Sequence, residues 1–275
     1  MPETRARPVW RGAISFGLVN VPVRAFAAVR DHDVHFHQIE KGSGARIRNR
    51  KVSAESGEEV DAADIEMGFE IAEGRYVTFE KDELDELRPA STRVIEVTDF
   101  VPLADVDPVY FERTYWLAPD GDAARKPYQL LRAAMEERER VAVGTAVMRN
   151  KQYLAAVRPM DGALAMSTMR FADEVVPRSQ VDEVPDRRTK PDAKMLRMAT
   201  QLVDSLASDW DPKRYHDTYT EELRARIEAK EAGEEITTEP VEAEQPEVVD
   251  LMAALEASVR SARSGGRRSR RRKSA

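Results

Sequence analysis

The chain has 275 residues, of which 41% are hydrophobic, and a formal net charge of −7. This length and apolar content suffice for one large folded domain or two modest ones. The absence of cysteine excludes disulfides, thiolate catalysis and cysteine-ligated zinc or iron–sulfur sites. No apolar run approaches about eighteen residues and the N-terminus lacks a signal-peptide core, so we expect a cytoplasmic protein with no membrane association.

The first half of the chain is predicted to be rich in β-strands. Four segments favour extended structure: residues 12–23, 75–80, 92–101 and 108–117. Within the first segment, Ile14, Phe16 and Leu18 alternate with small or polar residues and therefore share one face. The other three segments are rich in β-branched and aromatic residues. We expect all four to pair as antiparallel strands.

Residues 126–138 are predicted to form a helix that interrupts the strands, because their apolar positions recur at helical spacing. The apolar face comprises Tyr128, Leu131 and Met135. Pro127 falls in the first turn of this predicted helix, where proline is tolerated. Three further strands are expected over residues 141–150, 152–159 and 163–171. Asp161 and Gly162 form a tight-turn signal between the last two strands, so we predict a meander or barrel of at least seven strands.

From Pro191 onward the apolar residues follow a helical period, with a break at residues 209–217. The apolar positions are Met195, Met198, Leu202 and Leu206 before the break, and Tyr219, Leu223 and Ile227 after it. The predicted fold class is therefore α+β, dominated by β-strands and ending in helices.

The composition changes again toward the C-terminus. Residues 233–247 combine acids and prolines with almost no large apolar residue, which is typical of a solvated linker. The next segment is predicted to be an amphipathic helix, with Val248, Leu251, Met252, Leu255 and Val259 on one face. From Arg260 on there are eight Lys or Arg and no acid, so the preceding 259 residues carry 35 basic against 50 acidic residues. The predicted organisation is a core (1–190), a helical arm (191–232), an acidic linker (233–247), an amphipathic helix (248–262) and a basic tail (263–275).

Cations also cluster within the predicted core. Residues 1–51 hold ten Lys or Arg against four acids, whereas residues 52–123 hold five against twenty. Arg46, Arg48 and Arg50 alternate, so an extended ribbon would point three guanidinium groups to one side. Such clusters suit a duplex phosphate backbone, and the absence of a base-reading motif favours sequence-independent binding. The predicted DNA-contacting cations are Arg46, Arg48, Arg50, Lys51, Arg149, Lys151, Arg187, Arg188 and Lys190, with Arg267, Arg268, Arg270, Arg271, Arg272 and Lys273 in the tail.

No catalytic or metal motif is evident. Asp33, His35 and His37 would share one face of a predicted strand, but side chains at this spacing diverge and suit a metal poorly. A polar outer strand face is the simpler interpretation, so we predict no metal site. There is no nucleophile-elbow serine, dinucleotide fingerprint or P-loop. We therefore expect no enzyme activity, no cofactor and no small-molecule substrate.

Seven blocks of the sequence resemble those of one family, in the same order. They are "VWRGAISFGLVNVPVRAF", "GFEIAEGRYVTFEKDELDEL", "IEVTDFVPLADVDPVYFERTYWLAP", "YLAAVRP", "MRFADEV", "MATQLVDSLASDWDPKRYHDTYTEELRARIEAKEAG" and "VVDLMAALEASV". The family is that of the bacterial Ku proteins, the DNA-end-binding factors of non-homologous end joining, and the resemblance covers nearly the whole chain.

The resemblance implies an antiparallel Ku-type β-barrel with a DNA-encircling bridge, a helical arm and a flexible C-terminal extension. Two copies would form a ring-shaped homodimer that threads over a double-stranded DNA end. Arg46 to Lys51 would belong to the bridge, and residues 191–230 would support dimerisation. The apolar face of residues 248–259 would engage the partner DNA ligase D. Some relatives carry a cysteine pair near residues 51–60, and its absence here argues against a metal-stiffened loop.

Two questions stay open at this point. The first is the role of the basic tail. A threaded ring is retained on DNA without base contacts, and the tail could contact DNA beyond the ring while the acidic linker resists collapse onto the DNA. A tail that only keeps the protein in solution would have the same sequence features. A non-specific nucleoid DNA-binding protein would carry a similar tail, but it should bind closed circles as well as linear DNA. The sequence is also compatible with a protein scaffold or an enzyme acting on DNA ends.

Overall fold

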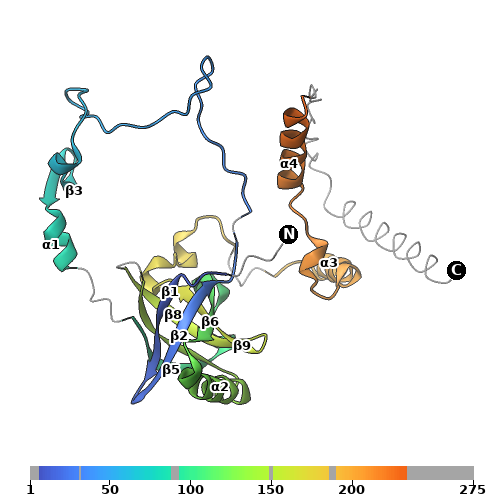
Figure 1. Cartoon of the computed structure of the whole chain (residues 1–275). Helices are drawn as coiled ribbons and strands as arrows, with labels where there is room; N and C mark the ends of the chain where they lie inside the picture. Colours follow the sequence, from blue (N-terminus) through green and yellow to red (C-terminus); the bar gives the residue numbers. More distant parts are fainter. Residues whose placement is uncertain (1–5, 31, 88–92, 149–150, 186–189, 234–275) are drawn as a thin grey trace. The chain divides into compact units, whose positions relative to one another are not determined.

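The computed structural model describes residues 6–30, 32–87, 93–148, 151–185 and 190–233 (Figure 1). Contacts divide the chain into two compact units, of which the first comprises residues 1–32 and 36–180 and the second comprises residues 33–35 and 181–275. The first unit contains all the described strands, and the second contains the last two described helices. None of the described helices has the length and apolar character needed to cross a membrane.

The first unit is built on a closed barrel in the order β1-β2-β6-β9-β8-β7-β5 (Figure 1). Its strands are β1 (Trp10–Phe16), β2 (Val19–Ala27), β5 (Val94–Pro102), β6 (Phe111–Pro119), β7 (Arg140–Met148), β8 (Lys151–Met160) and β9 (Ala163–Met169). Every neighbouring pair is antiparallel except β1 and β5, which pair in parallel and close the barrel. The expectation of exclusively antiparallel pairing was therefore wrong at this one seam.

Two strand predictions also need correction. Residues 12–23 form two strands, because Gly17 adopts a positive φ of 57° and turns the chain. Leu18 lies in this turn, fully exposed, and does not share the buried face of Ile14. Residues 75–80 correspond to β4 (Arg75–Phe79), which pairs with β3 (Met67–Ala72) in a separate two-stranded sheet outside the barrel. The hairpin at Asp161 and Gly162 is confirmed: both residues have positive φ, 47° and 74°.

Helix α2 (Asp122–Glu137) packs on the barrel through the predicted apolar face. Tyr128, Leu131 and Met135 are buried, and Ala124 extends the same face by one turn. The helix begins four residues earlier than predicted, so Pro127 lies in the second turn. The Tyr128 hydroxyl donates to the carbonyl of Leu117 on β6 and accepts from the amide of Leu164 on β9, both at 2.7 Å. Burial raises the pKa of Tyr128, which keeps the phenol a neutral donor.

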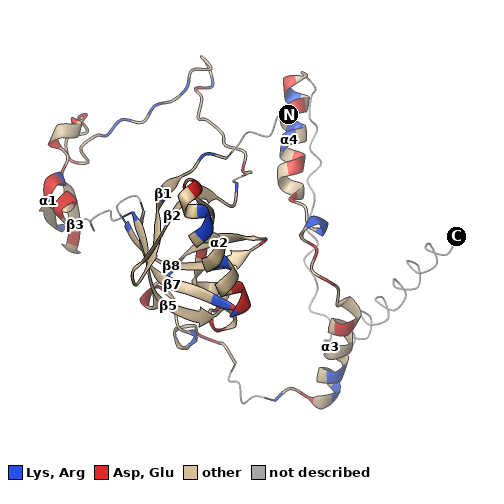
Figure 2. Ribbon diagram, turned by 60° about the horizontal axis from the view of Figure 1, so that its bottom comes forward, with Lys and Arg blue, Asp and Glu red and all other residues tan. Residues whose placement is uncertain are grey.

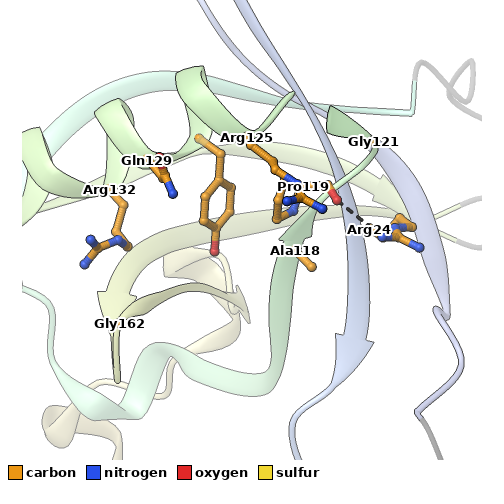
Figure 3. Close-up of a pocket in the computed structure, with 9 residues that line it drawn as sticks. Arg24, Ala118, Pro119, Gly121, Arg125, Gln129, Arg132 and Gly162 are labelled. Carbon is orange, nitrogen blue, oxygen red and sulfur yellow. Dashed lines mark hydrogen bonds between the residues drawn. The ribbon is translucent and has the colours of Figure 1, made fainter. Parts of the chain in front are cut away.

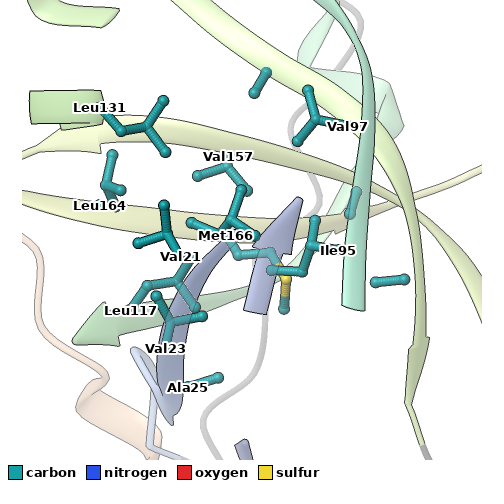
Figure 4. Packing of buried hydrophobic residues seen from close by; sticks show 14 of the residues in the cluster. Val21, Val23, Ala25, Ile95, Val97, Leu117, Leu131, Val157, Leu164 and Met166 are labelled. Carbon is teal, nitrogen blue, oxygen red and sulfur yellow. The ribbon is translucent and has the colours of Figure 1, made fainter. Parts of the chain in front are cut away.

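One hydrophobic cluster joins the barrel strands and the buried face of α2 (Figure 4). Its largest fully buried members are Ile14, Val21, Val23, Ile95, Leu117, Val157, Leu164 and Met166. Small residues such as Ala25, Ala142 and Ala155 complete the cluster. Alternation along the strands therefore places these apolar residues inside the barrel.

The described residues between β2 and β5 contribute no strand to the barrel. They contain β3, β4, the 3-10 turn η1 (Ala62–Asp64) and the short helix α1 (Lys81–Glu86). Glu80 and Glu83 form a capping box at α1, which buries no residue. The remaining short turns are η2 (Leu103–Asp105), η3 (Pro108–Tyr110), η4 (Ala172–Glu174), η5 (Arg178–Gln180) and η6 (Pro212–Arg214).

The second unit contains α3 (Ala193–Leu206) and α4 (Thr218–Glu231), as the helical period predicts. Asp192 and Asp217 cap the two helices, and the hydrogen bonds from Thr220 lower the pKa of Asp217. Neither helix has a buried residue. The linker from residue 234 on, the amphipathic helix at 248–262 and the tail at 263–275 lie outside the described residues.

Candidate nucleic-acid interface

Two small hairpins of matching geometry lie between β2 and η1. Backbone bridges join Ile39 to Arg46 and Val52 to Glu59, thirteen residues further on. Gly44 and Gly57 occupy the same turn position with φ of 69° and 71°. Their amides donate over 2.9 Å to the carbonyls of Glu40 and Ser53, the equivalent residues of the two hairpins. The repeated Ser-Gly pairs at 43–44 and 56–57 are the sequence signal for this repeat, which the sequence analysis missed.

The chain connecting the two hairpins carries four of the predicted DNA-contacting cations. Arg46, Arg48, Arg50 and Lys51 are all exposed. No continuous ribbon forms here, since regular pairing is confined to the backbone bridges at Arg46 and Val52. The paired ribbon on which the three guanidinium groups would align does not form among these residues, and their alignment stays a prediction. The cations are instead neighbours along an exposed, extended connection.

Two of these cations have partners in the hairpins. Arg46 Nη2 lies 3.2 Å from Nδ1 of His37, and because a guanidinium group can only donate, the ring nitrogen accepts. Arg50 Nη1 lies 2.7 Å from Glu59 Oε2 in an exposed ion pair. Within the described part of the chain, Arg48 and Lys51 have no such partner. They are therefore the cations most available to an external anion.

Charge is sharply divided along this segment (Figure 2). Residues 41–51, which we name the basic run, hold five Lys or Arg and no acid. Residues 52–66 hold six Asp or Glu and no Lys or Arg. A polyanion is attracted to the basic run and repelled by the hairpin that follows, so the segment favours one orientation of a bound phosphate backbone.

Of the other predicted cations, Lys151 and Lys190 lie among the described residues. Lys151 begins β8, is exposed, and holds its ammonium group 5.2 Å from the ring centroid of Tyr153. Lys190 is exposed and belongs to the second unit. The remaining predicted sites lie outside the described residues: Arg149, Arg187, Arg188, the six tail cations Arg267, Arg268, Arg270, Arg271, Arg272 and Lys273, and the apolar residues Val248, Leu251, Met252, Leu255 and Val259.

The histidine-rich stretch does not form the predicted strand. Residues 32–37 have no strand assignment, and His37 is engaged by Arg46. Across the part of the chain that the structure describes, no group of three or more His, Asp or Glu is arranged to hold a metal ion.

An arginine-lined cavity of about 400 Å³ lies where β2 meets the start of α2, and the sequence analysis missed it (Figure 3). Arg24 comes from β2, while Arg125 and Arg132 are seven residues apart and share one face of α2. Each arginine has an acidic neighbour: Asp120 lies 3.2 Å from Arg24, Asp122 lies 3.1 Å from Arg125, and Glu136 pairs with Arg132. These acids balance the positive charge, so the cavity is a weaker candidate for phosphate than the basic run.

Comparison with known proteins agrees with this architecture. The family model described as Ku, the Ku70/Ku80 beta-barrel domain, matches residues 15–198, about two thirds of the chain. This chain belongs to the Ku family. The closed seven-stranded barrel and the predicted Ku fold class are therefore confirmed.

Similar Ku proteins extend the match to almost the full chain. The non-homologous end joining protein Ku 1 of Saccharopolyspora erythraea is 43% identical over 259 residues, covering 94% of this chain and 80% of the relative. The corresponding protein of Anaeromyxobacter sp. (strain K) is 42% identical, covering 95% and 88%. That of Mycobacterium tuberculosis H37Rv is 41% identical, covering 93% and 95%. The alignments therefore reach well beyond the barrel.

Proposed function

We propose that this chain binds ends of double-stranded DNA as a ring-shaped homodimer in non-homologous end joining, without sequence preference, and that it recruits and stimulates DNA ligase D. The observation that carries the proposal is the basic run, an exposed set of five cations on a segment outside the barrel of a Ku fold. The relatives' names supply the repair pathway. The proposed role is binding and not catalysis, at the nucleoid in the cytoplasm.

Phosphate contacts explain how such a protein can bind DNA of any base sequence. Lys and Arg that neutralise phosphates bind any duplex, with an affinity that falls as salt rises. Arg48, Arg50 and Lys51 lie outside any helix or strand, and Arg46 takes part only in an isolated backbone bridge, so none of the four lies on a regular element that could enter the major groove. Retention by a closed ring requires only that the duplex be threaded. Specificity for ends then follows because a closed ring can pass onto a duplex only at a free end.

Uncovered apolar surface supports a homodimer. A 14-residue helix gains little stability from its own hydrogen bonds, yet α3 and α4 bury no residue within the described chain. Their exposed apolar residues include Leu196, Val203, Leu206 and Tyr219, and the β3–β4 hairpin adds Met67, Phe69, Ile71 and Val77. A second copy of the chain offers the same surfaces in return. Burial between copies would remove this apolar area from water.

The decisive experiment compares a linear duplex with the same sequence as a covalently closed circle. Gel-shift titrations at several salt concentrations are expected to show complexes on linear DNA that persist at moderate salt, while binding to the circle falls away, because only a free end allows threading. Equal retention on both forms would contradict end loading and would favour the non-specific nucleoid protein.

A chain ending at residue 262 serves as a second arm of this titration. Because it lacks seven of the chain's C-terminal cations, it is expected to keep the preference for linear DNA but to show a shallower dependence on salt. An unchanged salt slope would leave the tail with a solubilising role and no part in DNA binding.

The proposed dimer predicts a concentration-dependent change of mass that polar substitutions on α3 remove. Val203→Glu with Leu206→Glu places two charges on the uncovered apolar face, where both side chains are more than half exposed in the single chain. Sedimentation equilibrium should show a dimer for the parent chain and a monomer for this variant, with unchanged far-UV circular dichroism. A matched change on polar positions, Gln201→Glu with Ser205→Glu, should leave the dimer intact. A dimeric Val203/Leu206 variant would contradict the use of α3.

Recruitment of ligase D is proposed for the apolar face of residues 248–259. Leu251→Asp with Leu255→Asp introduces two charges on that face, so co-precipitation of purified ligase D is expected to fall at least about tenfold while DNA binding persists. Undiminished co-precipitation would remove this segment from the ligase interface.

A further inference from the structure

An uncovered apolar groove lies beside α2, on the flank nearest the β1–β2 turn. It has a volume of about 400 Å³. Phe16, Val19 and Phe100 form its strand side, and the two phenylalanine rings meet edge to face with centroids 6.0 Å apart. Its surface is largely apolar and open to water: Leu130 is 73% exposed and Phe100 is 43% exposed. No described segment of the chain covers these side chains.

On the helix side of the groove, apolar residues recur at a spacing that allows a second helix to pack against them. Pro127, Leu130 and Ala134 recur at i, i+3 and i+7 along α2, with Leu131 between them. A helix laid along such a stripe places its own residues at i, i+3, i+4 and i+7 against it. The groove therefore suits an amphipathic helix with one narrow apolar face.

Charge at the end of the groove restricts the occupant further. Arg138 and Arg140 line the groove where α2 ends and β7 begins. Neither arginine makes an ion pair with an acid of the described chain. An occupant that carries acids next to its apolar face would pair with both.

The chain contains one segment with these properties outside the described residues. Five apolar residues of 248–259 recur at helical spacing, namely Val248, Leu251, Met252, Leu255 and Val259. Glu247 and Glu256 flank this apolar face, and residues 234–259 contain eight acids and no Lys or Arg. The sixteen residues between α4 and Val248 can extend over roughly 55 Å.

We propose that the groove beside α2 receives this chain's own segment 248–259, with its apolar face against Leu130 and Phe100 and its acids near Arg138 and Arg140. A tethered segment competes at an effective concentration on the order of millimolar, so a free peptide of the same kind must displace it. The docked segment hides the apolar face assigned above to ligase D. Docking itself requires neither DNA nor ligase, so it can fail or hold independently of the proposed function.

Because the chain contains no cysteine, a thiol cross-linking test has no background from native thiols. Leu130→Cys with Leu255→Cys places the only two thiols of the full-length chain on the two proposed contact faces. A short bismaleimide is expected to join them at least about ten times faster than in the matched pair Leu130→Cys with Ala257→Cys, because position 257 lies on the opposite face of the predicted helix. Mass spectrometry of the tryptic peptides identifies the adduct, and mixing isotopically heavy and light chains separates links within one chain from links between copies.

Charge reversal provides an independent readout. Adding Arg138→Glu and Arg140→Glu to the Leu130→Cys/Leu255→Cys pair is expected to slow cross-linking several-fold, with the difference shrinking as salt rises. Circular dichroism checks that each variant is folded, and both arginines and Leu130 are exposed enough to tolerate replacement. Equal rates for positions 255 and 257 would overturn the proposal. In an equal mixture, heavy–light adducts amounting to about half of the total, as random linking between copies requires, would also overturn it by assigning the groove to the segment of a second copy.

Discussion

Replacing Arg46, Arg48, Arg50 and Lys51 with glutamate is expected to weaken binding to a linear duplex by about a thousandfold or more at moderate salt. Each lost phosphate contact lowers the slope of log affinity against log salt by about 0.9, so removing four contacts should flatten it by roughly 3.6 for each copy in the ring. The four new carboxylates add repulsion to that loss. Fluorescence anisotropy with a labelled duplex at three salt concentrations measures both the affinity and the slope.

Two companion variants separate charge from side-chain shape. Lysine in place of Arg46, Arg48 and Arg50 preserves the charge, so affinity should stay within several-fold of the parent chain. Glu59→Gln removes the acid that faces Arg50 at 2.7 Å and should strengthen binding modestly. Parent-like affinity in the fourfold glutamate variant would place the phosphate contacts elsewhere in the molecule.

The barrel and α2 were largely predictable because their signals are local. Tyr128, Leu131 and Met135 fall on one helical face in the sequence and are buried together in the structure. The same local alternation gave a wrong prediction at Leu18, because the alternation of apolar residues continues in the sequence across the turn that Gly17 creates. The parallel pairing of β1 with β5 joins residues about eighty positions apart, and no local pattern encodes such a contact.

The candidate site was also predictable from the sequence only where its signals are local. Charge clustering in the sequence predicted the basic run, but it could not assign partners to its members. His37 reaches Arg46, and Glu59 reaches Arg50, only because each hairpin folds back over nine residues. The cavity around Arg24 and Arg125 joins two cations that are a hundred residues apart, and the apolar groove joins the β1–β2 turn to α2. Both sites depend on tertiary packing and were therefore invisible to sequence patterns.

The structure also shows why β5 depends on two glycines in its neighbouring strands. A Cβ added at Gly12 on β1 would overlap the carbonyl oxygen of Arg93, just before β5. A Cβ at Gly144 on β7 would overlap the carbonyl oxygen of Glu96 and lie 2.7 Å from its carbonyl carbon. Gly144 pairs with Val97, next to an irregularity in the β5–β7 register. The backbone of β5 therefore approaches both neighbours more closely than a side chain permits.

Gly144→Ala is consequently expected to destabilise the barrel by about 3 kcal/mol, at the upper end of overpacking effects, because the obstacle is backbone and not a movable side chain. For a chain of this size that corresponds to a fall in Tm of roughly 6–12 °C, measurable by thermal unfolding followed by circular dichroism. Gly42→Ala is the matched control: nothing lies within 4 Å of its added Cβ and its φ is not positive, so its Tm should stay within about 2 °C of the parent. Because β5 returns the chain to the barrel after the segment that holds the basic run, loosening this strand should also weaken DNA binding at temperatures near the lowered Tm. A Gly144→Ala chain with unchanged Tm would show that β5 and β7 can separate without loss, contrary to the closed barrel.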